Sequence, residues 1–266
     1  MSTYPYWQKQ TKAAPLFQGI DTNRPEQKQF AGHLLIIGGH SGSFFSVANI
    51  TTKALEQGIG TVRTILPDSL KTRIPPTPET IFVPSAASGS IGKIALPHLL
   101  AASDQADFIL VIGDLGKNAE TATTLTEFLK ITNQPTLITR DAIDLVTTDI
   151  TAWIDRSNLT ILATLPQLQK LFRTIYYPKV ITLSMPMNQL VETLHKFTLS
   201  YQPTILTYYQ NQIIVAKSGN IITTELSTTP YTPITVWNGD LATRIARLSI
   251  WNPASPVLEI IAAALI

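Results

Sequence analysis

Residues 32–67 read GHLLIIGGHSGSFFSVANITTKALEQGIGTVRTILP and contain the pattern that decides the fold. Residues 34–37 are continuously apolar, which is typical of a strand that is buried on both faces of a parallel sheet. A glycine loop follows, residues 44–58 have helical spacing, and Gly58 ends that helix before a β-branched strand at 61–66. A strand, a helix and a second strand in this order predict a βαβ unit.

The same alternation continues to the end of the chain. Further strands are predicted at 81–84, 108–112, 135–138, 159–162, 179–183 and 204–207. Further helices are predicted at 96–102, 119–131, 165–172, 186–200, 241–250 and 255–265, and a hairpin at 212–224. The apolar runs at 34–37, 108–112 and 159–162 should form central strands. This pattern predicts an α/β protein of three layers, with a mostly parallel central sheet between helices.

The composition indicates a folded chain with one main domain. The 266 residues are 44% hydrophobic and 14% charged, which excludes a largely disordered protein. The net charge of +2 provides no general attraction to nucleic acid or to an anionic membrane. No change in composition marks a second domain, so we expect an N-terminal arm at 1–32 and a single domain at 33–266.

The arm is polar and rich in proline, and its aromatic residues leave two alternatives open. They can anchor the arm on its own domain or on a neighbouring subunit of a homo-oligomer: Tyr4, Tyr6, Trp7 and Phe17. The absence of cysteine excludes disulfides and thiolate metal sites. No apolar run resembles a signal peptide or is long enough to span a bilayer, so we expect a cytoplasmic protein.

Two glycine loops follow predicted buried strands. The first is GGHSG at 38–42, and the second is GDLG at 113–116. The carboxyl ends of parallel strands form the edge where α/β sheets bind ligands, and glycine lets a backbone approach a ligand closely. We therefore expect one cleft lined by Gly39, His40, Gly113 and Asp114, together with Gly239 and Asp240 of the loop described next. Gly38 and Gly116 are further candidates for binding the substrate. Tight turns without a ligand are the alternative explanation of these glycines.

A third candidate, Asn238-Gly239-Asp240, precedes the helix predicted at 241–250. The free N–H groups of a first helical turn attract anions, so Asn238 and Gly239 are candidates for binding a phosphoryl group. The carboxylate of Asp240 is suited to take a proton from a substrate hydroxyl. Ordinary capping of the helix is the alternative interpretation of the same three residues.

Several common catalytic signatures are absent from the sequence. The first glycine loop is neither a Walker A loop nor a G-x-G-x-x-G dinucleotide loop, and no G-x-S-x-G nucleophile elbow occurs. The four histidines have no spacing that is typical of metal ligands: His33, His40, His98 and His195. We therefore predict no metal site made of protein side chains alone.

The three loops occur in an order that resembles the ADP/ATP-dependent NAD(P)H-hydrate dehydratases. Residues 32–67 resemble that family's opening, with Gly58-Ile59-Gly60 where the family has a Gly-Ala-Gly turn. IGDLGKNAET at 112–121 is similar to the family's I-G-P-G-L-G followed by E-T, and TLITRDAIDLV at 136–146 resembles its strand ending in D-A-D-A-L. Residues 238–266 resemble the end of the family, where a Gly-x-Gly-Asp loop opens a helix.

This resemblance implies a ribokinase-like fold without a separate lid domain. It implies ADP or ATP as cofactor, with or without Mg²⁺, and a nicotinamide nucleotide or its hydrate as ligand. In the family, a phosphoryl group activates the ring hydroxyl of hydrated NAD(P)H, which then leaves. Asp240 would be the base, Gly239 and the following helix start would form the anion hole, and Ser46, Asp114 and Gly116 would face the substrate. Family members are commonly oligomers.

The family's nucleotide-binding motifs are altered in this chain. His-Pro-Gly-Glu falls on LPQL at 165–168, Lys-Gly falls on Thr207-Tyr208, and Trp237 stands beside the expected anion hole. The first aspartate of D-A-D-A-L is Thr139. Three functions therefore stay open: a divergent dehydratase, a non-catalytic nucleotide-binding or assembly relative, and a divergent small-molecule kinase. An active enzyme would need another cation near the site.

Overall fold

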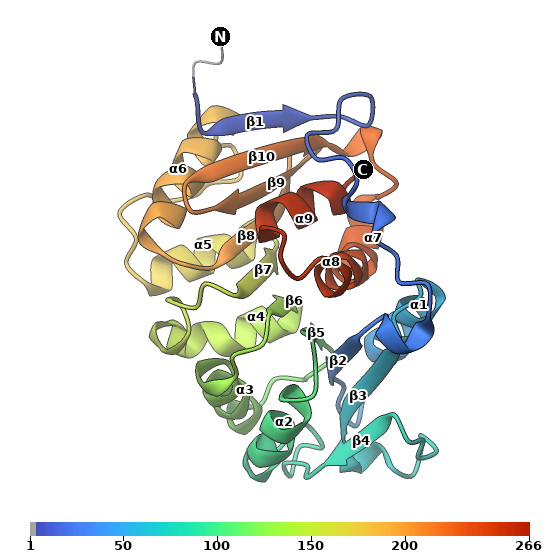
Figure 1. Cartoon of the computed structure of the whole chain (residues 1–266). Coiled ribbons are helices and arrows are strands. Elements are labelled where there is room, and N and C mark those ends of the chain that lie inside the picture. Colours follow the sequence, from blue (N-terminus) through green and yellow to red (C-terminus); the bar gives the residue numbers. More distant parts are fainter. Residues whose placement is uncertain (1–3) are drawn as a thin grey trace.

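A ten-stranded sheet runs through the centre of the computed structural model, which describes residues 4–266 apart from the side chain of Thr228 (Figure 1). Its strands are β1 (Trp7–Gln10), β2 (His33–Gly38), β3 (Thr61–Pro67), β4 (Thr80–Val83), β5 (Phe108–Gly113), β6 (Thr136–Thr139), β7 (Leu159–Ala163), β8 (Thr204–Tyr209), β9 (Gln212–Lys217) and β10 (Asn220–Glu225). The spatial order is β1-β10-β9-β8-β7-β6-β5-β2-β3-β4. In this spatial order, all neighbouring strands between β8 and β4 are parallel. Strand β9 is antiparallel to both of its neighbours, and β1 is parallel to β10.

Helices cover both faces of this sheet (Figure 1). One face packs against α1 (Phe45–Glu56), α7 (Pro233–Trp237), α8 (Asp240–Trp251) and α9 (Val257–Ala264). The other face packs against α2 (Leu96–Ser103), α3 (Ala119–Ile131), α4 (Asp141–Val146), α5 (Leu165–Thr174) and α6 (Met187–Ser200). The predicted three-layer α/β architecture with a mostly parallel sheet is thus confirmed.

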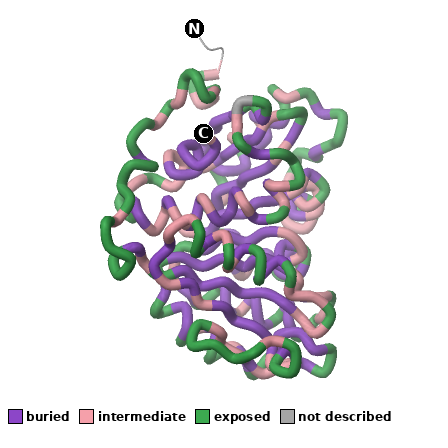
Figure 2. The backbone as a smooth tube through the Cα atoms, turned by 90° about the vertical axis from the view of Figure 1, so that its right-hand side faces the viewer, coloured by how far each residue is buried: buried purple, intermediate pink, exposed green. Residues whose placement is uncertain are grey.

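The central strands are buried on both faces, as their apolar sequences predict. In β2, Leu35 and Ile37 belong to one hydrophobic cluster, whereas Leu34 and Ile36 belong to the cluster on the opposite face. Such alternation follows from the two-residue period of a strand. The burial colours show the same arrangement, with buried backbone in the sheet and exposed backbone in the outer loops (Figure 2). The predicted central positions of β2, β5 and β7 are therefore confirmed.

Three elements differ from the sequence expectations. The N-terminal arm is not irregular throughout, because β1 extends the sheet beside β10, with the Trp7 indole donating to the Thr223 hydroxyl over 3.0 Å. The prediction of a strand at 179–183 is wrong. These residues form an irregular connection after α5, and the side chain of Val180 is exposed. The short helix α7 was not predicted.

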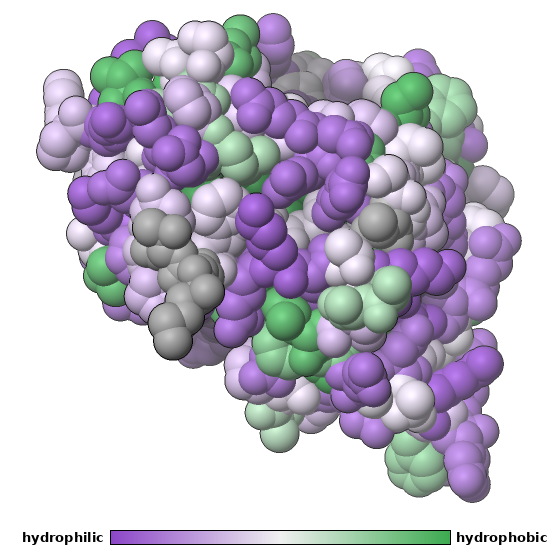
Figure 3. All heavy atoms as spheres, turned by 90° about the horizontal axis from the view of Figure 1, so that it is seen from above, coloured by the Kyte–Doolittle hydropathy of each residue, from purple (hydrophilic) through white to green (hydrophobic). Residues whose placement is uncertain are grey.

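The end of the molecule that carries β1 is mostly hydrophilic. Seen from above, apolar residues are scattered among hydrophilic ones on this face (Figure 3). The arm packs on its own domain here, where the Tyr6 ring stacks on the His195 ring with centroids 3.6 Å apart. Among the described residues, no helix is both long and apolar enough to cross a membrane.

Candidate functional site

The two glycine loops meet at the carboxyl ends of β2 and β5. The amide of Gly39 donates to the carbonyl of Gly113 over 3.1 Å. A Cβ at position 38 would lie only 2.5 Å from the same carbonyl oxygen. The two backbones can therefore approach this closely only because residue 38 is glycine. The predicted juxtaposition of these loops is therefore present.

His40 and the second loop are also in contact. The His40 Nδ1 atom lies 2.9 Å from the Asp114 carbonyl oxygen. A Cβ on Gly116 would lie 3.4 Å from the imidazole Cδ2 atom, which places this glycine against the ring. The first loop therefore holds His40 over the GDLG loop.

Asp141, at the start of α4, fixes the shape of the GDLG loop. Its two carboxylate oxygens accept the amides of Asp114 and Leu115, each over 2.9 Å. Asp114 has a backbone φ of 55°, a left-handed conformation that is uncommon outside glycine. The position of Asp141 at the start of a helix does not by itself reveal this role.

The Asp114 carboxylate already occupies one helix amino terminus at this edge. Its Oδ2 accepts the amide of Ser46, the second residue of α1, over 2.8 Å. Its Oδ1 pairs with the Arg140 guanidinium at 3.3 Å. Negative charge is favoured at a helix amino terminus, so Asp114 stabilises the start of α1. Ser46 and Asp114 are thus adjacent, but their polar groups are engaged with each other.

The amino terminus of α8 reaches the same edge of the sheet. Gly239 precedes α8 with a φ of 93°, and a Cβ there would lie 2.1 Å from Ile50 Cδ1 and 3.1 Å from Ile112 Cδ1. Ile112 directly precedes the GDLG loop, so the third candidate lies beside the other two. Within the part of the chain that the structure describes, no side chain caps α8, so the amides of its first turn lack a side-chain acceptor. Asn238 itself is exposed.

Asp240 forms an ion pair with Lys53 of α1. Both side chains are partly buried, with 25% of Asp240 and 29% of Lys53 exposed. Lys53 is a residue that the sequence reasoning missed. A usable signal was its position seven residues after Ser46, which places both on one side of α1. The ammonium group therefore lies beside the start of α8, where an anion would bind.

Residues 165–168 and Thr207-Tyr208, where the family has its nucleotide-binding motifs, contain no lysine or arginine. Thr207 is fully buried, and its hydroxyl has no hydrogen-bond partner in the described structure. Leu165 begins α5 behind a capping box formed by Thr164 and Gln167. The Gln167 amide also donates to the Arg140 carbonyl over 2.8 Å, so this segment is tied to the site loops.

The described residues contain no group of three or more histidines and carboxylates placed to hold a metal ion. A nucleotide-bound Mg²⁺ relies mainly on phosphate and water oxygens, so it needs few protein ligands. The α8 amino terminus and Lys53 suit the phosphate end of a nucleotide. The residues at Thr207-Tyr208 supply no charge for it.

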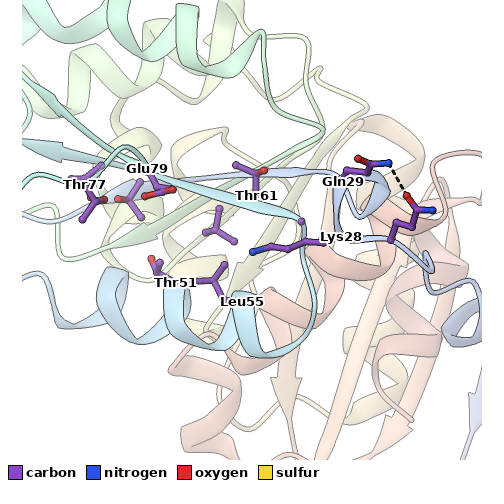
Figure 4. Close-up of a pocket in the computed structure, with 12 residues that line it drawn as sticks. Lys28, Gln29, Thr51, Leu55, Thr61, Thr77 and Glu79 are labelled. Carbon is purple, nitrogen blue, oxygen red and sulfur yellow. Dashed lines mark hydrogen bonds between the residues drawn. The ribbon is translucent and has the colours of Figure 1, made fainter.

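A groove of about 820 Å³ lies elsewhere, at the amino ends of β3 and β4 (Figure 4). Thr51 and Leu55 of α1 form one wall, and Lys28 and Glu79 face it from the connections that precede strands. The candidate site loops follow the carboxyl ends of strands, so they do not line this groove. Figure 4 therefore shows a surface distinct from the candidate site.

Comparisons with known proteins identify the fold. No protein-family model matches the sequence, and no curated protein matches it. A ribokinase-like superfamily protein from Enterococcus faecalis is 19% identical with a TM-score of 0.68, covering 98% of this chain and 85% of that one. An ADP/ATP-dependent NAD(P)H-hydrate dehydratase from Bacillus subtilis, co-crystallized with ATP/Mg²⁺, is 14% identical with a TM-score of 0.59, covering 94% and 86%. A Bacillus subtilis pyridoxal kinase in complex with ADP is 12% identical with a TM-score of 0.53, covering 88% of each chain. The chain therefore has the ribokinase-like fold.

Proposed function

We propose that the carboxyl edge of the sheet binds a nicotinamide nucleotide together with ADP or ATP, and that the chain is a divergent NAD(P)H-hydrate dehydratase. The observation that carries the proposal is the uncapped amino terminus of α8, with Asp240 and Lys53 beside it and the two joined glycine loops next to it. A carboxylate, a cation and free helix amides are the groups that phosphoryl transfer to a hydroxyl requires. The similar fold of a Bacillus subtilis hydrate dehydratase supports the same assignment.

In this proposal Asp240 accepts the proton of the nicotinamide ring hydroxyl as the hydroxyl oxygen bonds to phosphorus. The Lys53 ammonium and the α8 amides neutralise charge on the phosphoryl oxygens. ADP or ATP would supply the phosphoryl group: its terminal phosphoanhydride P–O bond would break, AMP or ADP would leave, and the phosphorylated hydroxyl would be a better leaving group. The C–O bond would then break with departure of inorganic phosphate, and loss of a proton from the adjacent ring carbon would restore the double bond. Lys53 thus supplies one cation at the start of α8, while the position of the family lysine at Thr207 carries none.

A non-catalytic nucleotide-binding or assembly relative is the second candidate, and a specific observation favours it. Charged groups at this edge are already paired with one another: Asp240 with Lys53, and Asp114 with Arg140 and the Ser46 amide. Such pairing stabilises the loops without any ligand. Under this second candidate, the same residues act only as structural contacts.

Replacing Asp240 with Asn separates the two candidates. The variant keeps the shape of the side chain but removes the base, so turnover of hydrated NADH with ADP or ATP should fall by at least about 100-fold. ADP affinity should persist, because the α8 amides and Lys53 remain. Asp155→Asn, at an exposed carboxylate on the surface, is the matched control.

Turnover in the parent that Asp240→Asn leaves unchanged would refute Asp240 as the base. A parent without turnover that still binds ADP would support the non-catalytic relative. The melting temperature, measured alongside, should fall modestly in Asp240→Asn, which loses the ion pair with Lys53, and should change little in Asp155→Asn.

A further inference from the structure

Three arginine side chains gather along α8 and the N-terminal segment, away from the site described above. Arg244 and Arg247 lie one turn apart on α8, and both contact the carboxylate of Asp21, at 3.3 and 2.5 Å. Arg24 follows three residues after Asp21. A Cβ on Gly58 would lie 3.6 Å from Arg24 Nη2 and 3.7 Å from Trp251 Cζ2, which places Arg24 near Trp251.

Within the described residues, one carboxylate forms ion pairs in this cluster of three arginines. Asp21 is the carboxylate shared by Arg244 and Arg247, whereas Arg24 forms no hydrogen bond or ion pair within the described residues. Burial lowers the pKa of Arg247, Asp21 raises it, and the neighbouring Arg244 and Arg24 lower it. Like charges therefore lie close enough to disfavour one another. An additional anion would relieve this repulsion.

Buried hydrogen-bond donors in the cluster lack acceptors. The Nε atoms of Arg244 and Arg247 and the indole Nε1 of Trp251 are buried and have no partner in the described structure. Trp251 is only 8% exposed, and the Arg247 guanidinium lies 4.8 Å from its ring centroid. Buried donors are nearly always satisfied in folded proteins, so these three donors require a further acceptor, which is either water or an anion.

The segment that carries Asp21 is held in place independently of the arginines. The amide of Asn252, at the end of α8, donates to the Ile20 carbonyl over 3.0 Å, and its Oδ1 accepts from the Asn23 amide over 2.6 Å. Asp21 is 49% exposed, so its carboxylate can turn to solvent without disturbing these contacts. In Figure 1 this segment runs down past α7 and α8 before it enters β2.

We propose that Arg24, Arg244 and Arg247 form a phosphate-binding site in which Asp21 occupies the position of the anion when no ligand is bound. A phosphate has the several acceptor oxygens that unpaired guanidinium donors need, and the planar arginine fork matches phosphate geometry. The ligand is inorganic phosphate or the phosphate group of a nucleotide. The site does not depend on Asp240 or on the proposed reaction.

Calorimetric titration of the full chain with inorganic phosphate at constant ionic strength tests this site. Arg247→Gln should weaken phosphate binding by about 10- to 100-fold, as expected for the loss of a charge-assisted contact. Arg173→Gln, at an exposed arginine on α5, is the control and should bind phosphate as the parent does. Arg247→Lys retains the charge without the fork and should give an intermediate affinity.

Asp21→Asn provides the opposite test, because it removes the competing carboxylate. Phosphate affinity should rise in this variant, a gain that misfolding cannot produce.

Titration with ADP distinguishes the source of the phosphate. If Arg247→Gln weakens the binding of ADP, the ligand is a nucleotide phosphate. If Arg247→Gln weakens only the binding of inorganic phosphate, the ligand is the free ion. Absence of phosphate binding in the parent, or equal binding by Arg247→Gln and Arg173→Gln, would overturn the proposal.

Discussion

Gly239 shows how one residue determines the geometry of the candidate site. Its left-handed φ of 93° and the position of Ile50 Cδ1, 2.1 Å from where a Cβ would lie, both exclude a side chain. The close approach brings the start of α8 against α1, which places Asp240 beside Lys53. The same glycine therefore has a conformational role and a packing role.

Gly239→Ala should lower the free energy of unfolding more than the same substitution does at a left-handed glycine that has no close neighbour. Left-handed strain costs about 1–2 kcal/mol, and overpacking adds about 1–3 kcal/mol. Gly19→Ala is the matched control, since Gly19 has a φ of 91° but its nearest contact would be Thr22 Oγ1 at 4.0 Å. Urea denaturation should show the larger loss for Gly239→Ala; equal losses would mean that the contact with Ile50 is easily relieved.

At the level of elements, β1 attaches the N-terminal segment to the sheet through side chains as well as backbone. The Gln10 amide donates to the Thr224 hydroxyl over 2.9 Å and to the Ala262 carbonyl over 2.8 Å. Gln10 is buried, and it connects β1 with β10 and α9. Gln10 therefore ties the N-terminal strand β1 to two elements near the other end of the chain, β10 and α9.

Gln10→Met should cost about 1–3 kcal/mol of unfolding free energy, because it leaves buried acceptors without donors. Gln8→Met makes the same change at an exposed position of the same strand and should have little effect. Comparing the urea midpoints of the two variants isolates the buried hydrogen bonds. Similar midpoints would show that β1 contributes little to stability.

Tyr231 links the segment before α7 to α9 and gives a prediction for alkaline pH. Its hydroxyl donates to the Ala264 carbonyl over 3.0 Å, and burial raises the pKa of this hydroxyl while the charge of Arg244 lowers it. The tyrosine of the unfolded chain ionises near pH 10. Above that pH the unfolded chain loses this proton first, so the free energy of unfolding falls as pH rises toward the higher pKa of the folded state.

Tyr231→Phe should be less stable than the parent near pH 7 by about 0.5–1.5 kcal/mol, because it lacks the hydrogen bond. The difference in unfolding free energy between the parent and Tyr231→Phe should become smaller as the pH rises above 10, since the variant has no hydroxyl to ionise at this position. Tyr176→Phe, at an exposed side chain, is the control. A difference between parent and Tyr231→Phe that stays constant from pH 8 to 11, in urea denaturation, would contradict this account.

For the whole molecule, local patterns were sufficient to predict the layers of the fold. The apolar runs at β2, β5 and β7 and the glycine at the end of α1 lie within single elements, so the sequence contains them directly. β1 was missed because its four residues are mostly polar and its partner β10 lies at the other end of the chain. The run at 179–183 was mistaken for a strand because β-branched composition does not show whether a neighbouring strand is available.

The same distinction applies to the candidate site. The glycine loops and the start of α8 were identified because each follows a predicted strand or begins a helix. The ion pair of Lys53 with Asp240 joins residues 187 positions apart and depends on how α1 and α8 cross. No local pattern contains that crossing. The spacing of Lys53 and Ser46 places both on one side of α1, but the pairing of Lys53 with Asp240 follows only from the folded molecule.

The most direct test of the central claim is calorimetric titration with ADP of the parent and of Lys53→Met. The account predicts binding in the high micromolar range or weaker, because Thr207-Tyr208 supplies no cation. Loss of the Lys53 charge should weaken it by about a further 10-fold or more. Lys130→Met, at an exposed lysine of α3, should bind as the parent does. Submicromolar binding, or an affinity that Lys53→Met leaves unchanged, would contradict the assignment of the phosphate site to the start of α8.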